Sequence, residues 1–353
     1  RAMTTLIKYV GTTPISELSI TGKPGTWQPG EIQSRTDADA ALFQASGKWK
    51  TASPSSLIPD GSVPVSAASS GDGGIGLQVG DKKFPPAVST PKASFKLKEA
   101  AERLGIQIGA AFELRDLAGS YGDLLSAETD VWTPENGMKD QVVWKGPNQY
   151  DFTDADAFVA AASAAGKSIR GHTWIYPDKA ASSYNGWQNT TNITNENWRS
   201  LIDGYFSTAC PRYQNLIGVD VINEMYTTDI TSPFPDGYKS SPWLIASGDG
   251  DIFMDYVFRT CRKYTANNIP LFYCDNGTEQ GNDPNRNKKR ERILGGLTRL
   301  KNNGTPIDGF SMQYHLIVDK KYYYQNDRAR HRDFLRGLVD LGLIVNITEI
   351  DIR

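Results

Sequence analysis

The stretch GVDVINEMY, residues 218–226, decides how the fold is interpreted. It opens with a mostly apolar run of the kind that forms a strand buried on both faces, as in a parallel sheet. It then reaches Asn223 and Glu224, two polar residues that such a strand does not need for packing. A carboxylate at the end of a buried strand is either an ordinary surface residue or part of a site, and the rest of the chain has to decide between the two.

Similar apolar runs recur along the chain and alternate with segments whose apolar residues follow the helical period. Several of the helical segments end in Gly, as the C-terminus of a helix often does. Strands are expected at residues 106–112, 129–136, 168–176, 216–224, 270–276, 308–316 and 343–352. Helices are expected at residues 154–166, 196–210, 251–265, 289–304 and 328–342.

Seven β/α units in series predict an α/β fold with a parallel sheet. A (β/α)8 TIM barrel is the natural closure of that pattern. The alternative, an open doubly wound sheet, usually has a Gly-rich turn after its first strand, and GAAFEL at residues 109–114 does not supply one. We therefore expect residues 95–353 to form a barrel in which seven units are visible.

Residues 1–94 are expected to form a small module, β-rich or irregular, of unknown role. Residues 50–95 are rich in Ser, Pro, Gly and Ala, which predicts loops, short strands or a linker. Upstream, two β-type runs (5–10 and 15–20) and one helix (35–47) are expected. We interpret the module as an anchor or assembly piece through which a partner chain or a larger assembly could bind.

The composition excludes several classes of protein. The 38 Lys and Arg residues nearly balance the 40 Asp and Glu residues, so no global field attracts nucleic acid or a membrane surface. No apolar run is long enough for a membrane span. The three Cys residues have no short spacing, which predicts neither a disulfide framework nor a zinc site. Residues 4–10 lack the apolar core of a signal peptide, and the compartment stays open.

In a barrel the chemistry lies at the carboxyl ends of the strands, and polar or aromatic residues gather at the ends of six expected strands. The strand ends carry Glu135, Asn136 and Lys139; His172, Trp174 and Tyr176; Asn223 and Glu224; Asp275 and Asn276; Gln313 and His315; and Glu349 and Asp351. Two carboxylates among amides, imidazoles and aromatic rings suit glycoside hydrolysis, which needs one protonated and one ionised carboxyl group. A metal-dependent hydrolase is less favoured, because His172 and His315 have no carboxylate-rich ligand set, and we expect no metal and no cofactor.

These motifs resemble those of glycoside hydrolase family 10, the endo-β-1,4-xylanase family with a (β/α)8 barrel. The resemblance covers residues 96–353. Its motifs follow one another in the family's order: GAAF (109–112), TPENGMK (133–139), RGHT (170–173), VDVINE (219–224), IDGFSMQYHL (307–316) and ITEIDI (347–352). Members of this family are usually secreted.

The resemblance implies a role for each matched residue. Glu224 would be the general acid/base and Glu349 the nucleophile of a retaining endo-glycosidase acting on a polysaccharide, with xylan the leading substrate. Asn223 would bind the 2-hydroxyl group of the sugar, His315 would orient Glu349, and Gln313 would lie beside Glu224. The sugars on the non-reducing side would be held by Glu135, Asn136, Lys139 and His172, with Tyr176 in the place of a stacking Trp.

The chain departs from the family pattern at several places, which leaves strict specificity for xylan open. Asp140 replaces a Trp, Pro177 a His and Val219 a Trp, and Cys274 stands in the place of an Asn. The family's eighth strand region has no counterpart before Arg353, so we expect an open seam with unpaired strand edges. The competing interpretation is a non-catalytic or assembly-dependent carbohydrate-binding protein on the same kind of barrel.

Overall fold

The computed structural model describes residues 66–69, 75–79, 82–83, 96–177, 186–228, 234, 236–279, 284–316 and 328–352. The chain divides into two compact units near Lys96 and Leu97, and each is described by itself. In the first unit, β1 (Ser66–Ser69), β2 (Ile75–Val79) and β3 (Lys82–Lys83) form an antiparallel sheet. The strands and the helix expected in residues 5–47 lie outside the described residues.

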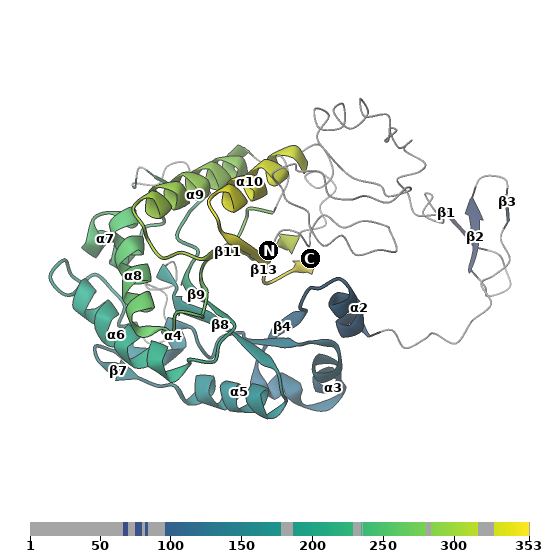
Figure 1. Cartoon of the computed structure of the whole chain (residues 1–353), viewed down its shortest axis with the longest axis horizontal. Helices are drawn as coiled ribbons and strands as arrows, with labels where there is room; N and C mark the ends of the chain where they lie inside the picture. Colours follow the sequence, from purple (N-terminus) through teal and green to yellow (C-terminus); the bar gives the residue numbers. More distant parts are fainter. Residues whose placement is uncertain are drawn as a thin grey trace. The chain divides into compact units, whose positions relative to one another are not determined.

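The second unit is built on one parallel sheet of seven strands, in the order β13-β11-β10-β9-β8-β5-β4 (Figure 1). The seven strands expected between residues 106 and 352 are confirmed, and neighbours in the chain are neighbours in the sheet, as in a barrel. The strands are β4 (Gly109–Phe112), β5 (Val131–Pro134), β8 (Ser168–Ile175), β9 (Gly218–Asn223), β10 (Leu271–Asp275), β11 (Gly309–Met312) and β13 (Ile344–Ile347).

Helices follow the strands and form an arc outside the sheet in Figure 1. The five predicted helices are confirmed, as α5 (Thr153–Ala164), α6 (Trp198–Arg212), α8 (Gly250–Tyr264), α9 (Pro284–Asn302) and α10 (Arg328–Asp340). The sequence analysis missed α2 (Leu97–Arg103) and α3 (Gly119–Glu128), and also the short helices α4 (Asp140–Val143) and α7 (Pro242–Ser247). Within the described ranges, none of the helices combines the length and apolar character that a membrane span requires.

Short elements decorate the barrel. A 3-10 turn, η3, spans Leu114–Leu117, and a hairpin is formed by β6 (Trp144–Gly146) and β7 (Gln149–Tyr150). At the carboxyl end of the sheet, β12 (His315–Leu316) pairs in parallel with β14 (Asp351–Ile352). This last pair extends β11 and β13 beyond the sheet and brings two of the expected site residues side by side.

The centre of the sheet is buried and its two edges are not. All residues of β9 and β10 are buried, whereas β4 has exposed positions and Ile347 at the end of β13 is 42% exposed. Among the described strands, β4 and β13 each pair with one neighbour only. The described part of the chain therefore has the open seam that the sequence predicts.

An aromatic cluster packs between the sheet and the helices beside β8. The ring of Trp144 stacks on Tyr205 of α6 at a centroid distance of 4.5 Å, and it lies 5.4 Å from Trp243 of α7. Trp187 packs against both indoles. Large buried rings contribute strongly to stability through the apolar area that they remove from water.

Candidate active site

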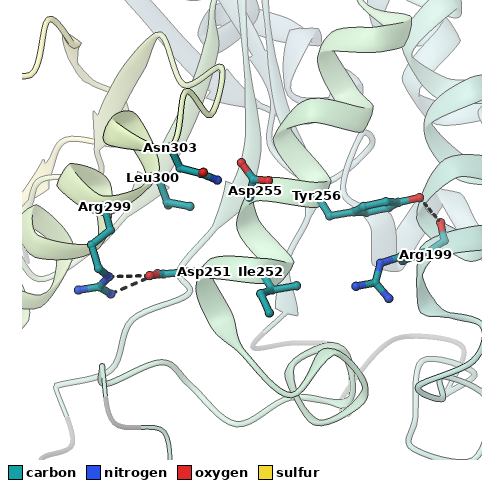
Figure 2. Close-up of a pocket in the computed structure, with 8 residues that line it drawn as sticks. All are labelled: Arg199, Asp251, Ile252, Asp255, Tyr256, Arg299, Leu300 and Asn303. Atoms are coloured by element: carbon teal, nitrogen blue, oxygen red, sulfur yellow. Dashed lines mark hydrogen bonds and ion pairs between the residues drawn. The ribbon is translucent and has the colours of Figure 1, made fainter.

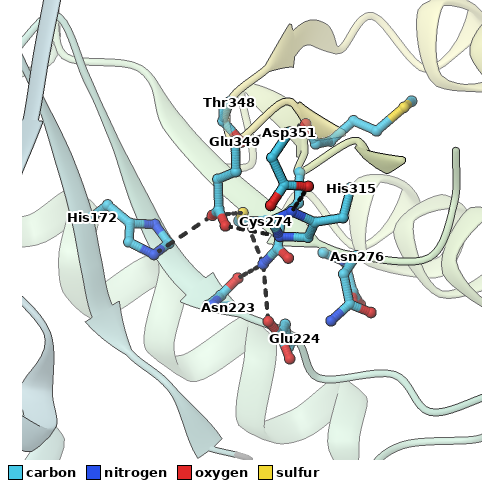
Figure 3. A network of polar contacts seen from close by, with 12 residues as sticks. His172, Asn223, Glu224, Cys274, Asn276, His315, Thr348, Glu349 and Asp351 are labelled. Atoms are coloured by element: carbon cyan, nitrogen blue, oxygen red, sulfur yellow. Dashed lines mark hydrogen bonds and ion pairs between the residues drawn. The ribbon is translucent and has the colours of Figure 1, made fainter. Parts of the chain in front are cut away.

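Glu224 lies directly after the last residue of β9, and Glu349 lies two residues after the last residue of β13, at the carboxyl edge of the sheet (Figure 3). Each is tied to the neighbouring strand through its backbone: Glu224 N–H donates to the carbonyl of Cys274, and Glu349 N–H donates to that of Gln313. Glu224 has a φ of 55°, in the left-handed region that few residues other than glycine adopt. The sheet therefore continues just far enough to fix both carboxylates on one face.

Glu224 is held as a carboxylate by three donors. Lys239 Nζ lies 3.1 Å from its Oε2, Gln313 Nε2 donates to its Oε1 at 3.0 Å, and Tyr176 adds a side-chain hydrogen bond. Burial alone would raise the pKa of Glu224, but the charge of Lys239 and these hydrogen bonds outweigh it and lower the pKa to about 2. In the free protein Glu224 is therefore ionised near neutral pH.

Sequence reasoning missed Lys239, because it lies in a loop with no strand-end motif. Tyr226 and Tyr238 form an isolated bridge that folds this loop back over the end of β9. Lys239 N–H then donates to the carbonyl of Met225 at 2.7 Å, which places its side chain beside Glu224. The signal that could have found it is therefore a tertiary one.

Glu349 is flanked by two imidazoles. His315 Nε2 lies 3.3 Å from Oε2 of Glu349, and His172 Nε2 lies 3.7 Å from Oε1. His315 Nδ1 lies 3.0 Å from Oδ1 of Asp351, which β14 brings alongside. The hydrogen bond to Glu349, together with Asp351, raises the pKa of His315 to about 9, so the ring is an imidazolium at neutral pH. Glu349 therefore faces a fixed positive charge.

The ring of His172 contacts a buried ion pair between Arg170 and Asp220. His172 Nδ1 lies 2.8 Å from Oδ2 of Asp220, and Arg170 bonds the other oxygen of that carboxylate and donates to Ser311 Oγ at 2.7 Å. Burial would raise the pKa of Asp220, but the Arg170 charge and the His172 hydrogen bond lower it to about 2. The sequence analysis did not single out Arg170 or Asp220, although charged residues in the middle of buried strands need such partners.

Gln313, which follows β11, contacts residues at the ends of β9 and β10. Besides Glu224, its Nε2 donates to Oδ1 of Asn223 at 3.1 Å and approaches Sγ of Cys274 at 3.9 Å. Cys274 Sγ in turn lies 3.9 Å from Oε1 of Glu349. The residues that the sequence places on four different strands thus meet in one contact network, which Figure 3 shows between the two carboxylates.

A second cluster gathers residues from the ends of β4 and β5. Asn136 Nδ2 donates to Oε1 of Glu113 at 2.6 Å, and Lys139 Nζ donates to Oδ1 of Asn136 at 3.1 Å. Glu135 lies beside them with an exposed side chain. Glu113 follows the last residue of β4 and was not singled out from the sequence. The structure thus brings together Asn136 and Lys139, two of the expected sugar-binding residues.

Two of the residues that depart from the family pattern, Tyr176 and Asp140, are connected to Glu224 by hydrogen bonds. Tyr176 is 9% exposed, and its side chain bonds Glu224. Its backbone N–H donates to Oδ1 of Asp140 at 3.2 Å. Gln188 holds the other oxygen of Asp140 at 3.2 Å, and no part of Asp140 is exposed. Burial raises the pKa of Asp140 to about 7.

Asp140 makes the stability of the fold depend on pH. Its pKa is raised in the folded state, so the folded protein binds the proton more tightly, and stability falls as pH rises from about 4 to 7. Three pKa units correspond to about 4 kcal/mol in the free energy of unfolding. Asp140→Asn is expected to abolish this fall in urea titrations at pH 4 and pH 7. Asp123→Asn, at an exposed position, is the control and keeps it. If the free energy of unfolding of Asp140→Asn fell between pH 4 and pH 7 as much as that of the unchanged protein, the assignment would be contradicted.

The strand-end residues Asp275 and Asn276 have a packing role. Lys289 Nζ lies 2.7 Å from Oδ1 of Asp275 and donates to Oδ1 of Asn276 at 2.9 Å. Asp275 and Lys289 are almost completely buried, so this ion pair fastens α9 to the end of β10.

A surface pocket lies between α6, α8 and α9, away from these residues (Figure 2). Arg299 and Asp251 pair across it at 2.5 Å, and the Tyr256 hydroxyl donates to the carbonyl of Arg199 at 3.2 Å. Its lining belongs to the outer helical layer and contains neither Glu224 nor Glu349. The carboxyl edge of the sheet remains the candidate site.

The comparisons with known proteins agree with the architecture and with the strand-end motifs. The endo-1,4-beta-xylanase A of Caldicellulosiruptor saccharolyticus is 29% identical over 256 residues, which cover 70% of this chain and 67% of that protein. The endo-1,4-beta-xylanase A of Fusarium oxysporum f. sp. lycopersici is 28% identical over 268 residues, which cover 74% and 76%. This chain is thus similar to xylanases over about three quarters of its length or slightly less.

Solved structures give the same result. Xylanase 10B of Thermotoga petrophila RKU-1, in complex with xylobiose, matches with a TM-score of 0.62 at 25% identity and covers 73% of this chain and 74% of its own. A psychrophilic glycoside hydrolase family 10 endo-beta-1,4-xylanase matches with a TM-score of 0.63 at 25% identity, over 73% and 77%. The model of glycosyl hydrolase family 10 matches residues 96–353. The chain belongs to glycosyl hydrolase family 10 and is an endo-1,4-beta-xylanase-like glycoside hydrolase.

Proposed function

We propose that this chain hydrolyses β-1,4-linked xylan inside the polymer with retention of anomeric configuration, using Glu349 as the nucleophile and Glu224 as the acid/base. The observation that carries the proposal is the convergence of both carboxylates on one network around Gln313, with an imidazolium on Glu349. Retaining glycosidases hold the two carboxyl groups about 5–5.5 Å apart, and we expect this spacing here.

Glu349 would attack the anomeric carbon while Glu224 gives its proton to the glycosidic oxygen, which leaves with the reducing-side sugars. This step breaks the glycosidic bond and forms a glycosyl ester on Glu349. Glu224, now a carboxylate, would take a proton from water, and the water oxygen attacks the anomeric carbon and releases Glu349. The imidazolium of His315 would orient Glu349 for the first step and stabilise it as the leaving group of the second.

The remaining residues would bind the sugars. Asn223 is held by Gln313 through its carbonyl oxygen, which leaves its amide N–H groups to donate to the 2-hydroxyl group. Asn136 and Lys139 would hold sugars on the non-reducing side, and the exposed Glu135 would accept from their hydroxyl groups. His172 contacts Glu349 itself, so it would act at the sugar that is cleaved.

Lys239 creates a protonation problem for this mechanism, because Glu224 must carry a proton when the first step begins. We expect bound substrate to weaken the Lys239 contact and so raise the pKa of Glu224. Lys239→Met is then expected to move the alkaline limb of the kcat/KM profile to higher pH by about 1–3 units. Lys263→Met removes an exposed lysine of α8 and is the control. An alkaline limb that does not move in Lys239→Met would contradict this role.

The same ion pair is the observation that favours the second candidate, a carbohydrate-binding protein without catalysis. A glycan-binding site can keep Glu224 permanently ionised as a hydrogen-bond acceptor. One pair of assays separates the two candidates. The migration of a binding protein is slowed by xylan in an affinity gel, but the protein releases no reducing sugar at any pH between 4 and 9.

The proposed function is tested by reducing-sugar release from xylan, with a linear β-1,4-glucan as the comparison substrate. We expect release from xylan, and proton NMR of a xylo-oligosaccharide digest should show the β-anomer first. A product that starts as the α-anomer would exclude retention. Release from the glucan alone would reassign the substrate.

A further inference from the structure

We infer that His172, Cys274 and Glu349 form a binding site for a zinc-type divalent ion, and that an ion bound there inhibits the enzyme reversibly. The imidazole Nε2, the thiol Sγ and a carboxylate oxygen of these residues all lie within 4.8 Å of one another. They come from three strands, β8 and β10 and the end of β13, and they face one another in Figure 3.

The separations suit a tetrahedral ion with nitrogen, sulfur and oxygen ligands. His172 Nε2 lies 3.7 Å and Cys274 Sγ lies 3.9 Å from Oε1 of Glu349. Ligand atoms bound to zinc at about 2.0–2.3 Å lie roughly 3.3–3.7 Å apart. Small rotations of the side chains therefore bring all three atoms into bonding distance, and a fourth position stays open for water.

The surrounding contacts orient two of the ligands for this role. His172 Nδ1 is 2.8 Å from Asp220, which fixes the ring and directs Nε2 toward Cys274 and Glu349. A carboxylate on the far nitrogen of a metal-binding imidazole is the usual outer partner of zinc histidines. His315 holds Oε2 of Glu349, which leaves Oε1 for the ion.

The charges of the site also favour a cation. Arg170 neutralises Asp220, Lys239 neutralises Glu224, and Lys289 neutralises Asp275. Among the described residues, Glu349 contacts two imidazole rings and no Lys or Arg side chain, so its carboxylate is available to a cation. Binding would release the proton of the buried Cys274 thiol, because the thiolate is the ligand.

An ion at this place would bind an oxygen of Glu349, the carboxylate that attacks in the proposed mechanism. The inhibition therefore rests on the proposed function, whereas the binding does not. The competing explanation for the close approach of His172 to Glu349 is a direct contact between the imidazole ring and the carboxylate, which predicts no metal binding.

The test is a titration of the full chain with Co²⁺, a spectroscopic substitute for Zn²⁺. We expect a near-ultraviolet charge-transfer band from thiolate to cobalt that saturates at one equivalent and disappears when Zn²⁺ is added. Cys274→Ser should lose the band. The matched control is the double variant Cys210→Ser and Cys261→Ser, which removes the two other buried thiols and should keep it. No saturable band, or a band lost only in the control, would overturn the inference.

Two further measurements keep the test independent of folding and of activity. X-ray absorption of zinc-loaded wild-type protein should show one sulfur ligand with nitrogen and oxygen ligands, and a shell without sulfur contradicts the site. Zn²⁺ should inhibit xylan hydrolysis, with reversal by a chelator, and Cys274→Ser should require at least about 10-fold more Zn²⁺. If xylan is not hydrolysed, the band still tests the site; if xylan is hydrolysed without any band, the site alone fails.

Discussion

Glu349→Ala is expected to lower the rate of xylan hydrolysis by roughly 10⁴-fold or more, the size of effect that the loss of the proposed nucleophile should have. The expected cause is the loss of the proposed attacking carboxylate, which His315 contacts at 3.3 Å. The measurement is reducing-sugar release under saturating xylan. Glu291→Ala removes a carboxylate exposed on α9 and serves as the matched control, with activity close to wild type.

The same variant allows a chemical check of the direction of attack. In Glu349→Ala an added azide ion can enter the space of the lost carboxylate and attack an aryl xylobioside that has a good leaving group. The product should be the α-glycosyl azide, because azide approaches from the face that Glu349 used. A β-azide, or full activity without azide, would show that Glu349 is not the nucleophile.

Glu224→Ala is expected to lower the rate of xylan hydrolysis by a factor comparable to that of Glu349→Ala. The first step should stay fast on substrates whose leaving group needs no proton. A dinitrophenyl leaving group departs without a proton, so the glycosyl ester on Glu349 still forms and then accumulates, because no base activates water. Stopped-flow absorbance should show a burst of dinitrophenol followed by a slow steady state.

Azide separates this variant from the first one. In Glu224→Ala azide attacks the glycosyl ester from the opposite face and gives the β-glycosyl azide, so the two variants yield products of opposite configuration. Equal loss of activity on xylan and on the dinitrophenyl substrate, with no burst, would contradict an acid/base role for Glu224.

The strand order and the carboxyl-edge cluster could be predicted because each rests on local sequence. Apolar runs separated by amphipathic segments specify a parallel sheet, and the polar residue after each run then lies on one edge. The strand containing Asn223 was expected at 216–224 and is found at Gly218–Asn223, with Glu224 directly after it. Gln313 meets Asn223 and Glu224 at this edge, although β10 lies between their two strands.

The contacts that tune the site could not be predicted, because they depend on tertiary structure. Lys239 reaches Glu224 through a loop that an isolated bridge folds back. Arg170 and Asp220 lie on different strands and pair only once the sheet has formed. Tyr176 stands in the place of a stacking Trp, and the hydrogen bond from its buried side chain to Glu224 could not be read from the sequence.

The local sequence explains why helix α3 was missed. Helix α3 contains Gly119 and Gly122, and Gly lowers helix propensity by about 1 kcal/mol relative to Ala. Few of its residues are buried, so its apolar stripe is weak. Gly122 is nevertheless required by packing, since a Cβ there would lie 1.9 Å from the carbonyl oxygen of Leu117. Gly is therefore needed at position 122 for close packing, despite its low helix propensity.

The central claim, that Glu349 forms the glycosyl ester, is tested most directly by trapping that ester. A dinitrophenyl xylobioside with fluorine at C2 slows both steps by destabilising the transition states, while its leaving group keeps the first step fast. Intact mass should rise by one fluorinated xylobiosyl group, and peptide mapping should place that group on Glu349. A label on another residue, or no label while the enzyme still hydrolyses xylan, would contradict the account.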